Sequence, residues 1–292
     1  MMNTTKIQNQ PVKSSQFSDF FRRMMKGWSS KLGLILFIII VFACVFGPWL
    51  SPYEENQMFM DQIKAGPSLA HLCGCDSMGR DLLTRLLYGG RQSLLLGLSA
   101  ALLSAAVGSA IGLVAGNAGG VVDDVIMRFM DVWSALPGML LCILISSFLG
   151  ADFFPTVIAL TVGNIPSVAR MIRGQVLGER TREYMEAAQV INCSKLSILF
   201  RHLLPNTIQP VIIITTMAIG STISMAASLS YIGLGIRPPA AEWGAMLADG
   251  RSAITTNPHL ITFPGIAIAL TILAINLLGD GLRNALDPKL RD

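Results

Sequence analysis

Residues 94–116 read LLLGLSAALLSAAVGSAIGLVAG, an unbroken stretch of 23 residues without a charged side chain. A helix of about 20 apolar residues crosses the hydrocarbon layer of a bilayer, and backbone groups in lipid must bond within their own segment. We therefore expect a membrane-spanning helix here. Small residues recur along it at short intervals, which predicts close packing against another helix: Gly97, Ala101, Ala105, Gly108, Gly112 and Gly116.

Five further apolar windows follow the same pattern, at residues 32–50, 132–149, 153–169, 211–232 and 260–279. Of the 292 residues, 52% are hydrophobic and 14% are charged, whereas a soluble domain carries about 25% charged residues. These proportions exclude a disordered chain, a nucleic-acid-binding domain and an ordinary cytosolic enzyme. The expected fold class is an all-α integral membrane protein with six transmembrane helices.

The distribution of Lys and Arg predicts the orientation, because cytoplasmic loops carry an excess of basic residues. With the N-terminus inside, 16 of the 22 basic residues lie on inner segments and six on outer segments. We therefore expect both termini in the cytoplasm. Asp123, Asp124, Arg128 and Asp131 are spaced as in an amphipathic helix, which we expect on the cytoplasmic surface.

The centres of the six windows contain no Asp, Glu, Lys, Arg or His, and Asn164 and Asn276 are the notable amides among their residues. Proton- or sodium-coupled carriers generally need ionisable residues there, so a passive channel or an externally powered permease remains. One face of window 211–232 carries a weakly polar stripe. This stripe either lines a path for a polar solute or packs against a neighbouring helix: Met217, Ser221, Ser224, Met225 and Ser228.

The longest inner connection, between windows 153–169 and 211–232, contains two amphipathic halves. Apolar residues recur with helical spacing in each half: Tyr184, Ala187, Ala188 and Ile191, then Leu196, Leu199, Phe200 and Leu203. The break at residues 192–194 offers Ser194 as a helix N-cap. The loop 179–203 is thus expected to form helix, corner and helix. Its first half suits either a socket on a cytoplasmic partner or the lipid headgroups.

Five cysteines in a chain of this length do not indicate a disulfide framework. His71, Cys73, Cys75 and Asp76 cluster on the outer side, and thiolate with imidazole would suit a soft metal ion. No second pair of ligands lies nearby in the sequence. Structural cysteines are therefore favoured over a metal site or a disulfide.

Four segments in order resemble one family. Glu186-Ala187-Ala188 followed by Leu204-Pro205 resembles the EAA loop of permease subunits from bacterial ATP-binding-cassette (ABC) importers. The segments CDSMGRD at 75–81 with YGGR at 88–91, PPAAEWG at 238–244, and NLLGDGLR at 276–283 resemble the dipeptide/oligopeptide/nickel group of that family. The loop after the first window is similar to that of the second, or C-type, permease of such systems.

The resemblance implies a type I ABC importer permease fold, and it assigns each part of the chain to the cytoplasm, the membrane or the periplasm. It places a cytoplasmic segment at 1–31, the first transmembrane helix at 32–50, a periplasmic segment at 51–90, the permease domain at 91–280 and a cytoplasmic tail at 281–292. It implies that the coupling to an ATP-hydrolysing subunit involves Tyr184, Glu186, Ala187, Ala188, Asn192, Leu204 and Pro205. Asn192 stands where the family has glycine, and asparagine is the next best residue for positive φ. Cys75 replaces the usual threonine.

The resemblance also implies the function and the partners. The chain would form half of the path of a bacterial inner-membrane importer for dipeptides, oligopeptides or a related solute, such as a nickel or metal chelate or glutathione. Its partners would be a second homologous permease, two ATP-binding subunits and a periplasmic solute-binding protein, within the lipid bilayer and without nucleic acid.

The chain has no phosphate-binding G-x-x-x-x-G-K-[ST] loop, so ATP and Mg²⁺ would be bound by the partner subunits. We expect no catalytic residue, metal site or cofactor in this chain. The alternative from another class is a passive membrane channel. A membrane-embedded enzyme is less favoured, because the three histidines form no motif.

Overall fold

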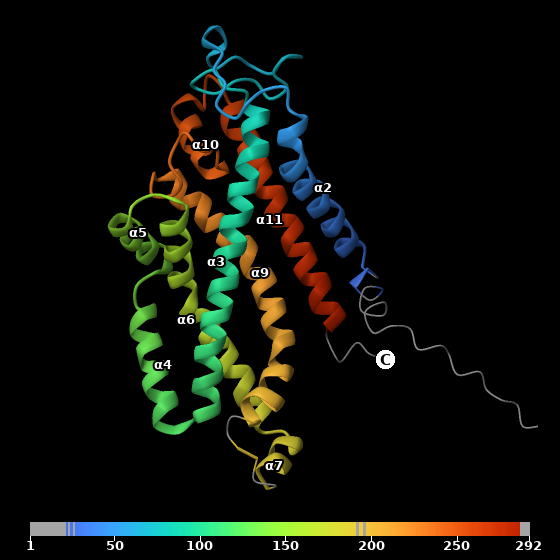
Figure 1. Ribbon diagram of the computed structural model, residues 1–292, viewed down its shortest axis with the longest axis vertical. Helices are drawn as coiled ribbons and strands as arrows, with labels where there is room; N and C mark the ends of the chain where they lie inside the picture. Colours follow the sequence, from blue (N-terminus) through green and yellow to red (C-terminus); the bar gives the residue numbers. More distant parts are fainter. Residues whose placement is uncertain (1–21, 23, 26, 191–192, 195–196, 287–292) are drawn as a thin grey trace, which may run out of the picture.

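The computed structural model describes residues 22, 24–25, 27–190, 193–194 and 197–286, and these are mostly helical (Figure 1). Among them no β-strand forms, and the isolated β-bridges pair Met58 with Arg80 and Cys75 with Asp81. The helices are α2 (Trp28–Leu50), α3 (Leu82–Ala118), α4 (Gly120–Ser134), α5 (Gly138–Leu149), α6 (Phe153–Arg180), α7 (Glu183–Val190), α9 (Leu204–Tyr231), α10 (Trp243–Gly250) and α11 (His259–Leu286). Short helical turns lie at Met60–Gln62, Ile198–Leu203 and Arg251–Ala253.

The length and composition of the helices confirm the predicted all-α membrane protein. Five helices, α2, α3, α6, α9 and α11, are long and apolar enough to cross a membrane, and the bent pair α4–α5 makes a sixth crossing if it is counted as one. Several helices extend beyond the predicted windows. α3, for example, begins at Leu82 rather than at residue 94, because the Asp81 carboxylate caps it by accepting a hydrogen bond from the Thr84 backbone N–H at 2.7 Å.

The window 132–149 is not one straight helix, and this corrects the sequence-based prediction. α4 ends at Ser134, α5 begins at Gly138, and the two helices meet at an angle of 79°. Pro137 between them has no backbone N–H to donate and disfavours helical backbone at Leu136. The proline therefore breaks the apolar run into two shorter helices.

The predicted amphipathic helix around Asp123 forms as α4, with Asp124, Arg128 and Asp131 exposed. α4 packs along the lower parts of α3 and α6 (Figure 1). Asp123 is buried, and its two carboxylate oxygens accept hydrogen bonds from Nε and an Nη of Arg173, each at 2.6 Å. The partly exposed Arg173 explains how Asp123 can be buried, since a paired carboxylate can leave water.

Close packing between α3 and α6 forms the centre of the molecule. Gly108, Gly112 and Gly116 face α6, and a Cβ at Gly112 would overlap the Ala169 carbonyl oxygen. Gly97, further up the same helix, faces Ile223 of α9. The small residues therefore serve helix packing, as the sequence predicted.

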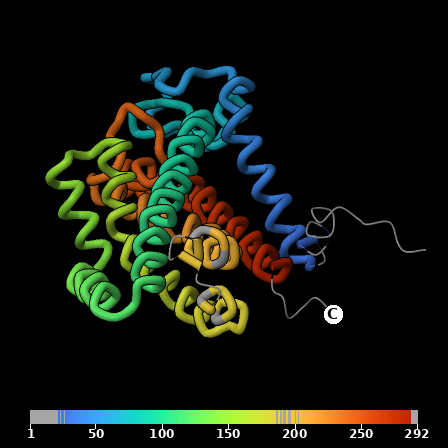
Figure 2. Tube along the Cα trace, turned by 60° about the horizontal axis from the view of Figure 1, so that its bottom comes forward, coloured from blue at the N-terminus to red at the C-terminus, as the bar shows by residue number. Residues whose placement is uncertain are grey.

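α2 lies at the side of the bundle against α11 and the upper part of α3 (Figures 1 and 2). Pro48 cannot bond the Cys44 carbonyl oxygen within the helix, and Arg91 Nε donates to that oxygen at 2.8 Å. Trp28 and Trp49 are exposed near the two ends of α2. They are separated by about 31 Å at ~1.5 Å per residue, close to the thickness of a hydrocarbon layer.

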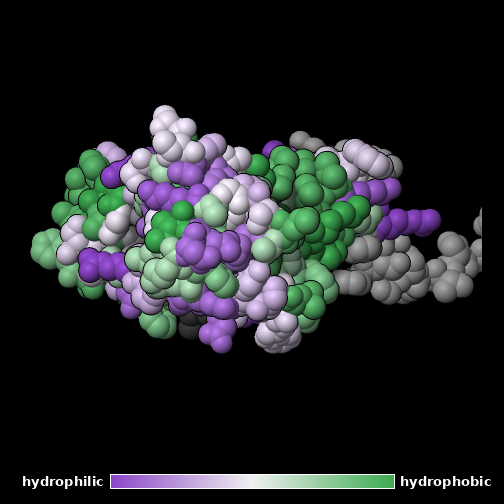
Figure 3. Space-filling view, turned by 90° about the horizontal axis from the view of Figure 1, so that it is seen from above, coloured by the Kyte–Doolittle hydropathy of each residue, from purple (hydrophilic) through white to green (hydrophobic). Residues whose placement is uncertain are grey.

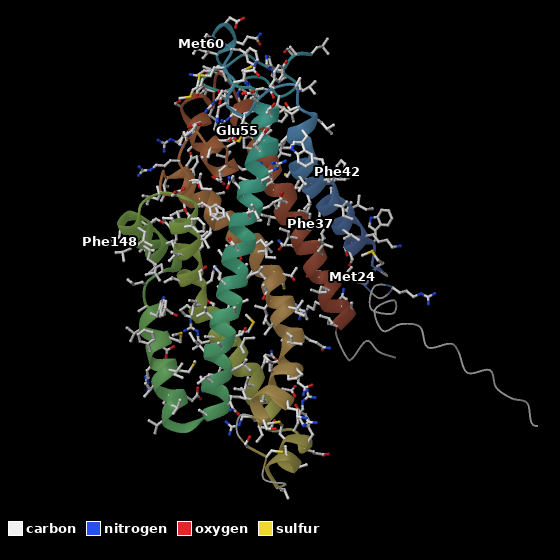
Figure 4. The ribbon with its side chains drawn as sticks, viewed as in Figure 1. Met24, Phe37, Phe42, Glu55, Met60 and Phe148 are labelled. Carbon is white, nitrogen blue, oxygen red and sulfur yellow. The ribbon has the colours of Figure 1, made fainter. Side chains whose placement is uncertain are left out.

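The side surfaces of the molecule are apolar. Phe42 on α2 and Phe148 on α5 are both exposed, at opposite sides of the bundle (Figure 4). From above, polar residues gather over the centre of the molecule and hydrophobic residues lie toward its sides (Figure 3). This distribution fits a bundle whose sides contact lipid and whose ends contact water.

The two ends of the bundle differ in structure (Figure 1). At the upper end, the loops between α2 and α3 form a compact segment over α10, which we name the cap (residues 51–81); Glu55 and Met60 of the cap are marked in Figure 4. At the lower end, α7 projects below the long helices, between α6 and α9 in the chain.

Candidate functional site

A cavity of about 770 Å³ opens between α6, α9 and the end of α11. Its walls carry amide, hydroxyl and thioether groups among aliphatic residues, and its charged groups belong to Glu179, Arg182 and Arg283. Glu179 and Arg283 lie near the lower ends of α6 and α11, and Arg182 lies between α6 and α7, so among the described lining residues the charge is at the mouth. The polar residues and methionines of the wall are Asn164, Ser167, Met171, Gln175, Asn206, Gln209, Met217 and Ser221.

The predicted path residues divide between two cavities and the surface. Asn164, Met217 and Ser221 line the large cavity, while Met225 and again Asn164 line a second cavity of about 300 Å³ at the α4–α5 break. Ser224 is exposed, and Ser228 donates to its carbonyl oxygen at 2.9 Å. The stripe thus combines residues at cavity walls with hydroxyls bonded to their own helix.

Apart from Asn164, the α6 wall of the large cavity was missed by sequence reasoning. On α6, Asn164, Ser167, Met171, Gln175 and Glu179 follow one another at intervals of three or four and line the cavity together. The predicted window ended at residue 169, but α6 continues to Arg180. Extending the 3.6-residue period through Gln175 would have revealed this polar face.

α7 presents two different faces. Met185 and Ala188 are buried against the chain, whereas Ala187 is exposed and Val190 is 84% exposed. Of the two adjacent alanines of the predicted coupling segment, Ala188 therefore faces the chain and Ala187 faces outward. Asn192 and the side chain of Glu186 lie outside the described part of the structure.

The second half of the loop differs from the predicted separate helix. Ser194 does accept a hydrogen bond from the Ser197 backbone N–H at 3.2 Å, as expected of an N-cap. The π-helical turn Ile198–Leu203 then runs directly into α9, which begins with Leu204 and Pro205. The second half is thus an extension of α9.

Polar contacts join α7 to the cavity mouth. The Tyr184 hydroxyl on α7 donates to Glu179 Oε2 of α6 at 2.6 Å, and Asn206 Nδ2 of α9 donates to the Tyr184 oxygen at 3.0 Å. Arg182 pairs with the other oxygen of Glu179 at 2.9 Å. Burial, followed by the contact with the Glu179 carboxylate, raises the pKa of Tyr184 above its usual range, so the phenol stays protonated at neutral pH.

At the upper end, the segment 75–81 forms a buried ionic cluster. Arg80 and Arg85 are each 2% exposed, and the Asp76 carboxylate lies 2.7 Å from Arg80 Nε and 3.4 Å from Arg85 Nε. His71 Nδ1 lies 2.9 Å from an oxygen of Asp81. Paired in this way, the charges can be buried together, and they hold the cap on α3.

α10 is fixed to α3 and the cap by a second set of bonds. The buried Glu242 carboxylate caps α10 by accepting from the Gly244 and Ala245 N–H groups, and it also accepts from Ser93 of α3 at 2.9 Å. Gly90 leaves room for the Trp243 ring, which would clash with a Cβ there. Segments 75–81, 88–91 and 238–244, distant in sequence, therefore meet at one end of the molecule.

The five cysteines are free thiols in this structure. Burial raises the pKa of Cys73 to about 11, with a further contribution from Asp81. Burial likewise raises the pKa of Cys75 to about 11, together with Asp81, Asp76 and Asp61. Both thiols are therefore protonated at neutral pH, and His71 and Asp76 are engaged with Asp81 and Arg80. Protonated thiols beside an imidazole and a carboxylate that already have partners are typical of structural cysteines rather than of metal ligands.

Comparison with known proteins identifies the class. Residues 108–292 match the family "Binding-protein-dependent transport system inner membrane component", and residues 15–67 match the N-terminal transmembrane domain of oligopeptide transport permease C. The chain belongs to the family of inner-membrane permeases of binding-protein-dependent ABC importers, in its peptide/oligopeptide group and of the C type. Membership of this family is consistent with a non-enzymatic role for the chain and disfavours the passive channel.

Curated relatives and solved structures agree with this family. The chain is 42% identical over 274 residues to the glutathione transport system permease protein GsiD of Escherichia coli O6:K15:H31, which covers 94% of this chain and 90% of that protein. It is 41% identical to GsiD of Pectobacterium atrosepticum, with 94% and 91% covered. A structure of the methionine ABC transporter MetNI in an inward-facing conformation aligns with a TM-score of 0.59 and 16% identity, over 70% of this chain and 97% of that one. The chain therefore has the type I permease fold.

Proposed function

We propose that this chain forms one half of the path of an ATP-driven importer and that its lower end faces the cytoplasm. The observation that carries this proposal is the cavity whose charged mouth lies beside α7. In this orientation the cavity opens toward the cytoplasm and the cap closes the chain on the periplasmic side. The excess of Lys and Arg on the inner segments supports the same orientation, with both termini inside.

The partners are inferred from two features of the chain, the missing phosphate-binding loop and the exposed face of α7. It has no phosphate-binding loop of its own, so two ATP-binding subunits supply ATP, Mg²⁺ and hydrolysis. The outward face of α7, with Ala187 and Val190, is the contact for one of them. A second, homologous permease covers the open side of the cavity, and a periplasmic binding protein delivers the solute to the cap end.

The wall chemistry supports a small peptide as the solute, with glutathione as the first candidate. Amide groups of Asn164, Gln175 and Gln209 can donate to and accept from peptide groups, and none of the described residues that line the cavity above its mouth is charged. Uncharged hydrogen-bonding walls release a zwitterionic peptide more easily than a fixed charge would. Glutathione is itself a tripeptide, and the GsiD relatives are named for its transport.

The test is reconstitution of the tagged chain with the second permease, the two ATP-binding subunits and the binding protein in liposomes. We expect ³⁵S-glutathione to accumulate only with ATP and the binding protein, and an unlabelled tripeptide to compete if peptides share the path. Conductance or solute flux without nucleotide, or purification without any ATP-hydrolysing subunit, would contradict the proposal.

A further inference from the structure

The hydroxyl of Tyr184 is the meeting point of three helices. It donates to Glu179 at the end of α6 at 2.6 Å and accepts from Asn206 near the start of α9 at 3.0 Å, while Tyr184 itself belongs to α7. Glu179 and Asn206 both line the cavity mouth, Glu179 on the α6 side and Asn206 on the α9 side. A single oxygen atom thus connects the projecting helix to two walls of the cavity.

The contacts around this hydroxyl differ in kind from the other contacts of α7. Met185 and Ala188 pack into an apolar cluster with residues such as Val176 and Leu203, and apolar packing has little directional preference. The hydrogen bonds of the Tyr184 hydroxyl with Glu179 and Asn206 fix both distance and direction. Arg182 occupies the second oxygen of Glu179 at 2.9 Å, which holds the carboxylate in place for the tyrosine.

We propose that Tyr184 is a positioning residue of the transport cycle. Its hydroxyl ties α7 to both α6 and α9, so a displacement of α7 by an ATP-hydrolysing subunit moves the two walls together and changes the width of the mouth. This inference rests on the proposed function and adds to it the atom through which the movement is transmitted. The α9 wall moves together with α7, because the turn Ile198–Leu203, which comes after α7 in the chain, continues into α9 without a break.

The decisive variant is Tyr184→Phe, because it removes the hydroxyl and keeps the ring that packs against the apolar cluster. Assembly of the complex and its ATP hydrolysis should remain near the wild-type level. Glutathione transported per ATP should fall about tenfold, since the loss of one or two hydrogen bonds shifts a two-state equilibrium by about that factor. Asn206→Ala removes the bond from α9 to the Tyr184 hydroxyl and leaves the bond to Glu179 in place, so it should give a smaller loss, about threefold.

The matched control is Tyr53→Phe, which also removes a hydroxyl hydrogen bond, from Tyr53 to the Ala70 carbonyl oxygen at 2.9 Å, but in the cap. It should leave the transport-to-ATP ratio unchanged. An equal loss in both variants, or a Tyr184→Phe complex that couples like the wild type, overturns the inference. A wild-type complex that shows no ATP-dependent uptake refutes the proposed function instead.

A second measurement does not depend on the identity of the solute. Spin labels at cysteines placed at Met171 on α6 and Met217 on α9 report the width of the cavity between its walls, and both residues are exposed enough to accept a label. In the wild type the distance distribution should shift when ATP and vanadate are added. In Tyr184→Phe the shift should be lost while nucleotide still binds. A full shift in the variant would show that α6 and α9 move without this tie.

Discussion

The buried ionic cluster of the cap gives a prediction whose size follows from the structure. Asp76 is the carboxylate closest to Arg80 and Arg85, both 2% exposed, and its Oδ1 also accepts from the Met78 and Arg80 backbone N–H groups at 2.8 and 2.9 Å. Asp76→Asn keeps an oxygen acceptor but removes the charge between two buried guanidinium groups. Removing one partner of a buried ion pair costs about 3–5 kcal/mol. We take the lower end, about 3 kcal/mol, because Asp249 still lies 3.9 Å from Arg80.

The assay is limited trypsin digestion of the detergent-solubilised complex, because trypsin cleaves after arginine and Arg80 is reachable only when the cap opens. A loss of about 3 kcal/mol raises the population of the open cap, and hence the cleavage rate after Arg80, by roughly 100-fold. Asp61→Asn, at an exposed carboxylate of the cap, is the control and should leave the rate within about twofold of the wild type. Equal cleavage rates in Asp76→Asn and the wild type would refute the reasoning.

Three further predictions concern other parts of the molecule. Gly112→Leu should prevent a folded complex from being recovered, because its Cβ alone would overlap the Ala169 carbonyl oxygen; a normal yield by size-exclusion chromatography contradicts this. Glu186→Lys should uncouple uptake from ATP hydrolysis with membrane insertion intact, and unchanged uptake in proteoliposomes would remove this residue from the coupling segment. Alkylation of Cys73 by iodoacetamide should accelerate about tenfold per pH unit from pH 7 to pH 9, because its raised pKa of about 11 leaves only a small thiolate fraction in that range. A rate that levels off below pH 9, measured by mass spectrometry, would contradict that pKa.

Much of the fold could be predicted from the sequence because membrane helices are specified by local composition. The windows in α2, α3, α6, α9 and α11 all fall on helices, since an apolar run in lipid has few other ways to bond its backbone. The glycines of α3 also indicated close packing correctly. What composition could not show was the break at Pro137, because the window 132–149 remains uncharged and mostly apolar on both sides of that proline.

The candidate site was less predictable from the sequence, because it depends on which faces of α6, α9 and α11 lie opposite one another in the fold. Asn164, Met217 and Ser221 were identified from their polarity within apolar windows, and all three line the large cavity. Gln175 was missed because it lies beyond the hydrophobic window.

The two faces of α7 could not be separated by spacing alone. Ala187 and Ala188 are adjacent and chemically identical, and only the packing of α7 onto α6 and the turn before α9 buries one and exposes the other. In the same way, the bonds of Tyr184 depend on helix ends brought together by the fold, and no sequence period indicates such a contact.

Site-specific photocrosslinking tests the central claim most directly, namely that an ATP-hydrolysing subunit moves this chain through α7. A photoreactive phenylalanine is placed at exposed Ala187 on α7 or at Leu69 of the cap, which is 99% exposed, in the assembled complex. The account predicts that position 187 crosslinks to an ATP-binding subunit and position 69 does not. A crosslink to that subunit from position 69 alone, or none from position 187 in an active complex, would contradict it.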